Sequence, residues 1–225
     1  MRSIDHVRIT LPSGTPAISV PHAGATTGLV IATDVWGLRP LFDDLAERLS
    51  AEWSMSVCVP EPFPGPPIPM EFEPRVAALR AADDAARLRD LQEAAAVTAC
   101  SRVVLIGFCM GGMYALKACS LHTFDRIVPF YGMIRVPEAW RGPGQGEPLD
   151  FVAAGDPECV LAIIGDQDPY TPPDDVAALE ALGVSTVRFP EAAHAFVHDP
   201  SRDAHRPADA AMAWQMAYEW LQGAV

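Results

Sequence analysis

The sequence predicts an α/β fold with a mostly parallel central sheet and helices on both faces. Short runs of branched apolar residues, such as 102–107 and 159–164, are typical of buried strands. Segments with helical periodicity, such as 207–222, separate these runs, and regular alternation of the two implies parallel crossovers. The 225 residues, 50% of them hydrophobic, can bury a sizeable core. We therefore expect a single domain over residues 1–225.

The first third of the chain predicts a hairpin followed by parallel units. Residues 5–11 and 16–20 flank the turn at Pro12, Ser13 and Gly14, as the strands of a hairpin do. Pro40 opens a helical pattern, because proline is favoured in the first turn of a helix. The remaining elements are expected at 28–33 and 55–59 (strands), 39–53 (helix) and 75–98 (a long helix).

Residues 60–74 contain seven prolines in fifteen positions, which excludes a helix or a central strand. We interpret this segment as a long loop, and long loops in compact domains often carry function. Two interpretations stay open for it. Either Phe63 and Phe72 form a wall of an apolar pocket near Trp36, or the segment is a rigid surface loop.

The second half of the chain continues the alternation. A strand at 126–131 is expected although Pro129 weakens it, and residues 135–150 are expected to form a loop because they are rich in glycine and proline. The other predicted elements are strands at 102–107, 159–164 and 185–189, and helices at 110–121, 173–182 and 207–222.

The charge of the chain argues against two classes of partner. The formal net charge is −13 and the isoelectric point is about 4.7, so nucleic acids and anionic membranes are not expected to bind. The segment MRSIDHVRITLPSG lacks the apolar core, about 7–15 residues long, of a signal peptide. No apolar run approaches the roughly 18 residues of a membrane span. We expect a cytoplasmic protein.

The five cysteines do not predict a disulfide framework or a metal site. Their number is odd, and no CxxC pair occurs among Cys58, Cys100, Cys109, Cys119 and Cys159. We expect no metal and no cofactor.

The segment Gly107-Phe108-Cys109-Met110-Gly111 lies between a predicted strand and a predicted helix. A side chain on such a sharp turn needs small neighbours, because the strand and the helix pack closely around it. The helix N-terminus favours negative charge nearby, which suits a thiolate and an oxyanion. The segment therefore has the pattern of a nucleophile elbow, with Cys109 as the nucleophile.

An acid and a histidine follow this elbow in the required order. The strand at 159–164 is followed by Asp166 and Asp168, and the strand at 185–189 is followed by His194. Both positions lie at carboxyl ends of strands, where open α/β sheets place their sites. Spacing alone leaves Asp166 and Asp168 as competing acids. His198 and His205 compete with His194, although a surface or capping role is expected for both.

The sequence resembles the dienelactone hydrolase family of α/β hydrolases over nearly its whole length. The resemblance rests on ATDVWG at 32–37, GFCMGG at 107–112, PFYG at 129–132, GDQDPYTPP at 165–173 and AHAF at 193–196. It implies an α/β-hydrolase fold. In that family the acid stands three residues after the strand-ending glycine, which selects Asp168. The histidine is followed two residues later by phenylalanine, which selects His194.

The resemblance also implies further site residues. Backbone N–H groups of Met110 and Val35 are expected to form an oxyanion hole, and Asp34 takes the place of a glutamate that controls the protonation of the thiol. Asp34 is one methylene shorter than that glutamate. Family members bind a substrate carboxylate with arginines; Arg75 and Arg80 lie near one expected region, and Arg39, Arg202 and Arg206 are alternatives. With Trp36, the arginines Arg39, Arg75 and Arg80 make up the predicted substrate pocket.

The predicted activity is hydrolysis of a small ester or lactone through Cys109, His194 and Asp168 and an acyl-thioester intermediate. The expected partner is a small molecule, and the chain is expected to be a monomer or a small homo-oligomer. Two other classes are considered: a catalytically silent α/β-hydrolase scaffold that binds a small ligand, and a thiol redox protein.

Overall fold

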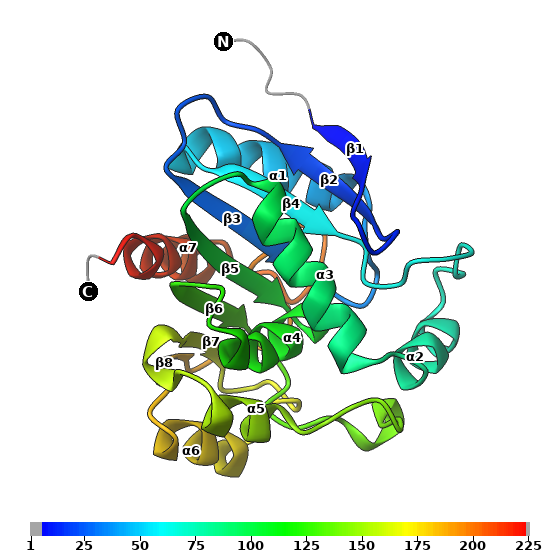
Figure 1. Cartoon of the computed structure of the whole chain (residues 1–225). Coiled ribbons are helices and arrows are strands. Elements are labelled where there is room, and N and C mark those ends of the chain that lie inside the picture. Colours follow the sequence, from blue (N-terminus) through cyan, green and yellow to red (C-terminus); the bar gives the residue numbers. More distant parts are fainter. Residues whose placement is uncertain (1–5, 224–225) are drawn as a thin grey trace.

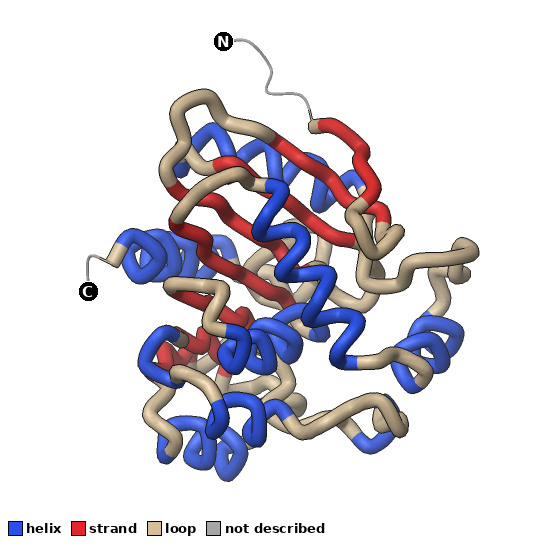
Figure 2. Tube along the Cα trace, in the orientation of Figure 1, coloured by secondary structure: helices blue, strands red, loops and turns tan. Residues whose placement is uncertain are grey.

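Eight strands form one sheet in the computed structural model, which describes residues 6–223 (Figures 1 and 2). The order is β1-β2-β4-β3-β5-β6-β7-β8. Strands β3 to β8 run parallel to one another, whereas β2 pairs antiparallel with both β1 and β4. The bounds are β1 (Val7–Thr10), β2 (Pro16–Val20), β3 (Thr27–Ala32), β4 (Ser56–Pro60), β5 (Arg102–Phe108), β6 (Arg126–Phe130), β7 (Leu161–Gly165) and β8 (Ser185–Phe189).

Helices cover both faces of this sheet, which confirms the predicted fold class. Figure 1 shows α1 (Pro40–Trp53) and α7 (Pro207–Gln222) behind the sheet, and α3 (Asp84–Val97) and α4 (Met110–Ala118) in front of it. The other helices are α2 (Phe72–Arg80), α5 (Pro148–Ala154), which packs against α4, and α6 (Pro173–Ala181). No helix between residues 6 and 223 has both the length and the apolar composition needed to cross a membrane.

The predicted hairpin is present, and its first strand begins at Val7; residue 5 of that prediction lies outside the described residues. The predicted strand at 126–131 is also present in spite of Pro129. Proline is tolerated here because the pairing of β6 with β7 is sparse. Within the described chain it consists of Phe130 opposite Ile163 and an isolated bridge from Ile127 to Val160, on either side of Pro129.

Two predictions of secondary structure were wrong. The single helix expected at 75–98 is two helices, because the Asp83 side chain accepts the Ala85 N–H and caps α3 as a new helix. Helix α2 begins earlier than expected, at Phe72. Pro74 falls in its first turn, where N–H groups have no partner within the helix, so a proline is tolerated there. The loop expected at 135–150 contains a 3₁₀ turn at Glu138–Trp140 and the start of α5.

Close backbone packing around the turn between β5 and α4 explains its glycines. A Cβ atom on Gly111 would overlap the carbonyl oxygens of Ala32 and Thr33, at the end of β3. A Cβ atom on Gly107 would overlap the carbonyl of Gly111. The absence of side chains therefore lets α4 begin directly against the ends of β3 and β5.

Replacement of Gly111 by alanine is expected to lower the free energy of unfolding by about 1–3 kcal/mol, the usual cost of overpacking. Guanidinium titration followed by circular dichroism measures this change. Gly146→Ala is the matched control, because its new Cβ would meet the ring edge of Phe151, which can move. Equal stability of the two variants would contradict the steric role assigned to Gly111.

Candidate active site

Cys109 occupies a strained turn at the carboxyl end of β5. Its φ of 57° and ψ of −117° lie in a region that L-residues rarely adopt. Two hydrogen bonds hold it there: its N–H donates to the Phe130 carbonyl at 3.1 Å, and its carbonyl accepts the Met113 N–H at 3.0 Å. The residue is 8% exposed. The thiol is therefore placed by backbone geometry at the start of α4.

Asp168 and His194 form a hydrogen-bonded pair beside this turn. His194 Nδ1 lies 2.7 Å from Asp168 Oδ2. The second oxygen of Asp168 accepts the Tyr170 N–H at 2.9 Å, so the carboxylate is fixed from both sides. Asp166, the competing acid, pairs instead with Arg188 at 2.6 Å. The carboxylate that contacts His194 is thus that of Asp168.

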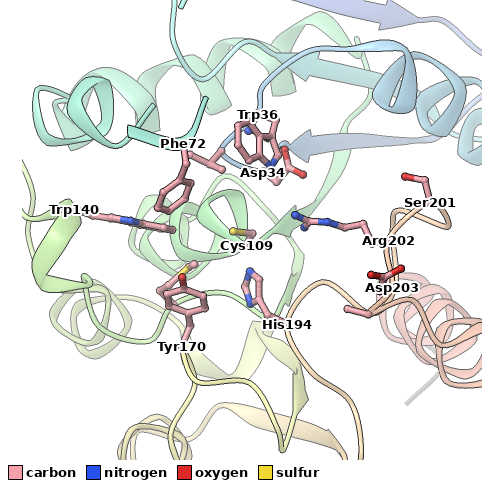
Figure 3. Close-up of a pocket in the computed structure, with 13 residues that line it drawn as sticks. Asp34, Trp36, Phe72, Cys109, Trp140, Tyr170, His194, Ser201, Arg202 and Asp203 are labelled. Atoms are coloured by element: carbon pink, nitrogen blue, oxygen red, sulfur yellow. Dashed lines mark hydrogen bonds between the residues drawn. The ribbon is translucent and has the colours of Figure 1, made fainter. Parts of the chain in front are cut away.

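The other nitrogen of His194, Nε2, is buried and has no hydrogen-bond partner within residues 6–223. His194 and Cys109 line the same cavity, and Figure 3 shows the imidazole next to the Cys109 sulfur. Burial lowers the pKa of His194. The negative charge of the Cys109 thiolate and the bond to Asp168 outweigh it and raise that pKa to about 10. This arrangement favours the imidazolium form of His194 beside Cys109.

The two predicted oxyanion donors belong to the first turn of α4 and to the loop after β3. Met110 is the first residue of α4, and the first N–H groups of a helix have no partner within the helix. Val35 lies in the loop after β3 and lines the cavity that Cys109 also lines. Their role as donors stays a prediction.

Asp34 is 2% exposed and makes an ion pair. Its two oxygens accept from Arg39 at 2.7 and 2.8 Å, from the Trp36 N–H at 3.0 Å and from His198 Nε2 at 2.9 Å. Burial raises its pKa, but the bonds to His198 and Arg39 outweigh burial and hold the pKa below its usual range. The predicted control of the Cys109 thiol by Asp34 stays a prediction.

The surface or capping role expected for His198 was wrong. The residue is 4% exposed, and its Nδ1 lies 2.5 Å from the Tyr131 hydroxyl. The polar composition of its neighbours misled the prediction, because the segment folds inward at this point. His198 is the residue that sequence reasoning most clearly misplaced.

The cavity above Cys109 has a volume of about 530 Å³, a size typical of small-molecule sites. Part of its lining is apolar and mostly aromatic: Val35, Trp36, Phe72, Met133, Trp140 and Tyr170. The polar lining residues include Asp34, His194, Ser201, Arg202 and Asp203. In Figure 3, the rings of Phe72, Trp140 and Tyr170 lie on one side of Cys109, and the segment Ser201 to Asp203 lies on the other. Trp36 and Phe72 had been expected near the pocket. Met133, Trp140 and Tyr170 were not, since they come from loops and a short 3₁₀ turn without a regular sequence pattern.

The three arginines predicted for the pocket do not line the cavity, and each contacts other groups. Arg39 pairs with Asp34, and Arg75 donates to the carbonyls of Ile68 and Pro69, which holds the proline-rich loop in place. Arg80 donates to the Ala139 carbonyl.

Of the alternative arginines, Arg202 lines the cavity, and its guanidinium points toward Cys109 (Figure 3). It makes no ion pair with the described residues, whereas Arg206 pairs with Glu191 and Asp209. Arg202 is therefore the cation that a bound anion would meet.

All five cysteines are free thiols. Between residues 6 and 223, no three histidine, cysteine, aspartate or glutamate side chains converge in a way that could hold a metal ion.

Comparison with known proteins matches residues 16–225 to the dienelactone hydrolase family. The chain belongs to this family. It is accordingly a hydrolase of the dienelactone hydrolase type, whose members act on lactones and esters. The resemblance inferred from the motifs and the α/β-hydrolase fold are confirmed.

Two curated relatives illustrate the family. A carboxymethylenebutenolidase from Rhodococcus opacus is 27% identical over an alignment of 224 positions, which covers 93% of this chain and 87% of the relative. A second relative, from Bradyrhizobium sp., is named "Probable 2-oxo-3-(5-oxofuran-2-ylidene)propanoate lactonase". It is 32% identical over 143 residues, covering 61% of this chain and 56% of the relative.

Solved structures share the fold. A provisionally assigned dienelactone hydrolase from Klebsiella pneumoniae superposes with a TM-score of 0.80 at 25% identity, covering 96% of this chain and 98% of that one. A dienelactone hydrolase-like promiscuous phosphotriesterase from metagenomic libraries gives a TM-score of 0.77 at 17% identity, with 97% of each chain covered. The second likeness shows the fold alone.

The raised pKa of His194 predicts how its contribution to stability depends on pH. A histidine with a raised pKa in the folded state stabilises fully below its unfolded value of about 6.5. That contribution is lost as the pH rises toward about 10, the folded value. The difference in unfolding free energy between wild type and His194→Gln should therefore be largest near pH 6 and fade toward pH 10. Denaturant titrations at several pH values measure it; a difference that grows with pH would contradict the assigned charge pair.

Proposed function

We propose that the chain hydrolyses small esters and lactones through nucleophilic attack by Cys109, with His194 and Asp168 as its acid–base pair. The observation that supports this most is the 2.7 Å bond between His194 and Asp168, beside a strained Cys109 that lines the same cavity. The order of these three residues along the chain is that of α/β hydrolases.

In the first half of the reaction, the Cys109 thiolate attacks the substrate carbonyl and forms a carbon–sulfur bond. The oxyanion that develops accepts hydrogen bonds from the Val35 and Met110 N–H groups. When the intermediate collapses, the carbon–oxygen bond breaks, and His194 Nε2–H gives its proton to the leaving oxygen. In a lactone the leaving alcohol stays attached to the acyl group, so the ring opens.

In the second half, His194 is neutral and takes a proton from water. The resulting hydroxide attacks the thioester, and the carbon–sulfur bond breaks to release the carboxylic acid and the thiolate. The proton on His194 restores the imidazolium beside that thiolate. Asp168 fixes the ring orientation throughout and stabilises the positive charge.

The cavity favours a flat, apolar acyl group with an anionic substituent. Trp36, Phe72 and Trp140 offer an aromatic surface on one side, and Arg202 offers a positive charge on the other. The names of both curated relatives describe substrates with a carboxyl-bearing side chain on a lactone ring. We propose that Arg202 pairs with a carboxylate of the substrate.

Incubation with p-nitrophenyl acetate is expected to place an acetyl group on Cys109, detected by intact-protein and peptide mass spectrometry. Cys109→Ala should lack both the adduct and turnover, because none of the other described cysteines lines the cavity. Cys100→Ala is the matched control, since Cys100 is also partly accessible but lies away from the cavity. Absence of adduct and turnover on a broad panel of esters and lactones would refute the proposed function.

Arg202→Gln is expected to raise KM for an ester that carries a carboxylate by about 3- to 10-fold, because a partly exposed ion pair contributes roughly 1 kcal/mol. KM for the matching neutral ester should not change. Arg206→Gln is the control, because Arg206 is close in sequence but pairs with acids outside the cavity. A KM ratio between the two esters that equals the wild-type ratio would rule out carboxylate binding by Arg202.

A further inference from the structure

A buried chain of hydrogen bonds lies beside the cavity and is not used in the proposed reaction. The Tyr131 hydroxyl lies 2.5 Å from His198 Nδ1, and His198 Nε2 lies 2.9 Å from Asp34 Oδ2. Asp34 in turn pairs with Arg39. These residues come from the segments that follow β6, β8 and β3, so the chain of bonds links three segments that border the site.

The positions of the protons in this series of hydrogen bonds follow from the charge of Asp34. Asp34 is ionised and can only accept, so the proton shared with it belongs to His198 Nε2. His198 Nδ1 then accepts the proton of the Tyr131 hydroxyl, whose pKa is raised by burial. Burial lowers the pKa of His198, which keeps the ring neutral against the opposing charge of Asp34. Both nitrogens of His198 are thus satisfied in one tautomer.

Packing fixes the imidazole of His198 in this position. Its ring stacks on Phe108 with the ring centres 4.7 Å apart and the planes inclined by 20°. Phe42 lies against it as well, with centres 5.9 Å apart. Phe108 is the residue directly before Cys109, so His198 packs on the side chain that immediately precedes the nucleophile.

At each end of this hydrogen-bond network, a backbone segment of the site is held in place. At one end, Asp34 Oδ1 accepts the Trp36 N–H at 3.0 Å, and this bond encloses Val35, the predicted oxyanion donor. At the other end, Tyr131 has a strained φ of 40° and donates its N–H to the Ile163 carbonyl at 2.7 Å. The preceding carbonyl, that of Phe130, accepts the N–H of Cys109.

The carboxylate of Asp34 has no acceptor capacity left for the thiol. Two carboxylate oxygens offer about four lone-pair sites. Four hydrogen bonds reach Asp34, two of them from Arg39 and one each from Trp36 and His198. The charge of Arg39 also balances that of Asp34. A direct transfer of the Cys109 proton to Asp34 would have to break one of these bonds.

We propose that Tyr131 and His198 are positioning residues that hold the Asp34–Trp36 loop, and with it the Val35 N–H, at a fixed place relative to Cys109. Asp34 acts through this loop and not as an acceptor of the thiol proton. The expected effect on kcat rests on the proposed function. The expected effect on the position of the Asp34–Trp36 loop does not.

Tyr131→Phe tests the proposal because it removes a single buried hydroxyl. We expect kcat for ester hydrolysis to fall about 10-fold, less than complete loss of an oxyanion donor costs, with little change in KM. The rate of iodoacetamide alkylation of Cys109 as a function of pH should stay as in wild type, since His194 sets the proton. Tyr114→Phe is the matched control: its hydroxyl is also buried but makes no hydrogen bond with residues 6–223. It should leave kcat unchanged.

Hydrogen exchange separates failure of this proposal from failure of the proposed function. In Tyr131→Phe, peptides covering residues 33–38 should exchange faster than in wild type and in Tyr114→Phe, because the bond to the Trp36 N–H loosens. This measurement needs no turnover, so it decides the proposal even if the wild type hydrolyses no ester. Unchanged exchange at 33–38, or a kcat equal to that of wild type in an active enzyme, would overturn the proposal.

A double-mutant cycle with His198→Phe tests whether the two residues act as one chain. The loss of kcat in the double variant should be close to that of the larger single loss, and not the product of both. The last measurement is the rate of iodoacetamide alkylation of Cys109 as a function of pH in Asp34→Asn. A pH profile that matches wild type supports the indirect role, whereas a shifted profile would show that Asp34 controls the thiol proton directly.

Discussion

The strained turn at Cys109 is the constraint on which the rest of the site depends. A positive φ at a residue with a side chain costs about 1–3 kcal/mol and persists only where surrounding contacts fix it. Here the contacts are two backbone hydrogen bonds and the close approach of Gly111 to the end of β3. The same approach sets the distance between the helix N-terminus and the loop that carries Val35. The strain at Cys109, the glycines and the place of the proposed oxyanion donors therefore all follow from one packing arrangement.

Two histidines four residues apart show how strongly the fold decides chemistry. His194 borders the cavity beside Cys109 and bonds to the Asp168 carboxylate, and its pKa is raised. His198 is buried beneath the cavity wall, where desolvation dominates, and its pKa falls. Both rings bond to an aspartate, yet the Asp34 charge is already balanced by Arg39. In the proposed site, His194 and Asp168 form a charged pair that takes part in the reaction. The neutral His198 ring only fixes the positions of its hydrogen-bond partners.

The sequence was sufficient for the sheet and for the three residues of the proposed triad, because these depend on local patterns. Strand-ending positions in a parallel sheet meet at one edge, so the order of Cys109, an acid and a histidine placed the candidates together. The resemblance to the family then selected Asp168 over Asp166, and His194 over the later histidines. The partners of Asp34 could not be predicted, because His198 lies 164 residues away along the sequence and its burial depends on how the last loop folds. Trp140 and Tyr170 were missed for the same reason, and the cap at Asp83 was hidden inside an Ala- and Arg-rich stretch.

The shorter acid at position 34 has a physical consequence of its own. An aspartate can bond the N–H two residues ahead and close a local turn, which a glutamate does less readily because its extra methylene carries the carboxylate past that N–H. Asp34 makes this bond to Trp36 and still reaches Arg39 and His198. In the proposed arrangement, the shorter side chain of Asp34 stiffens the loop beside the thiol and does not accept the thiol proton. Since the Asp34 carboxylate already accepts four hydrogen bonds, we propose that His194 exchanges the proton with Cys109.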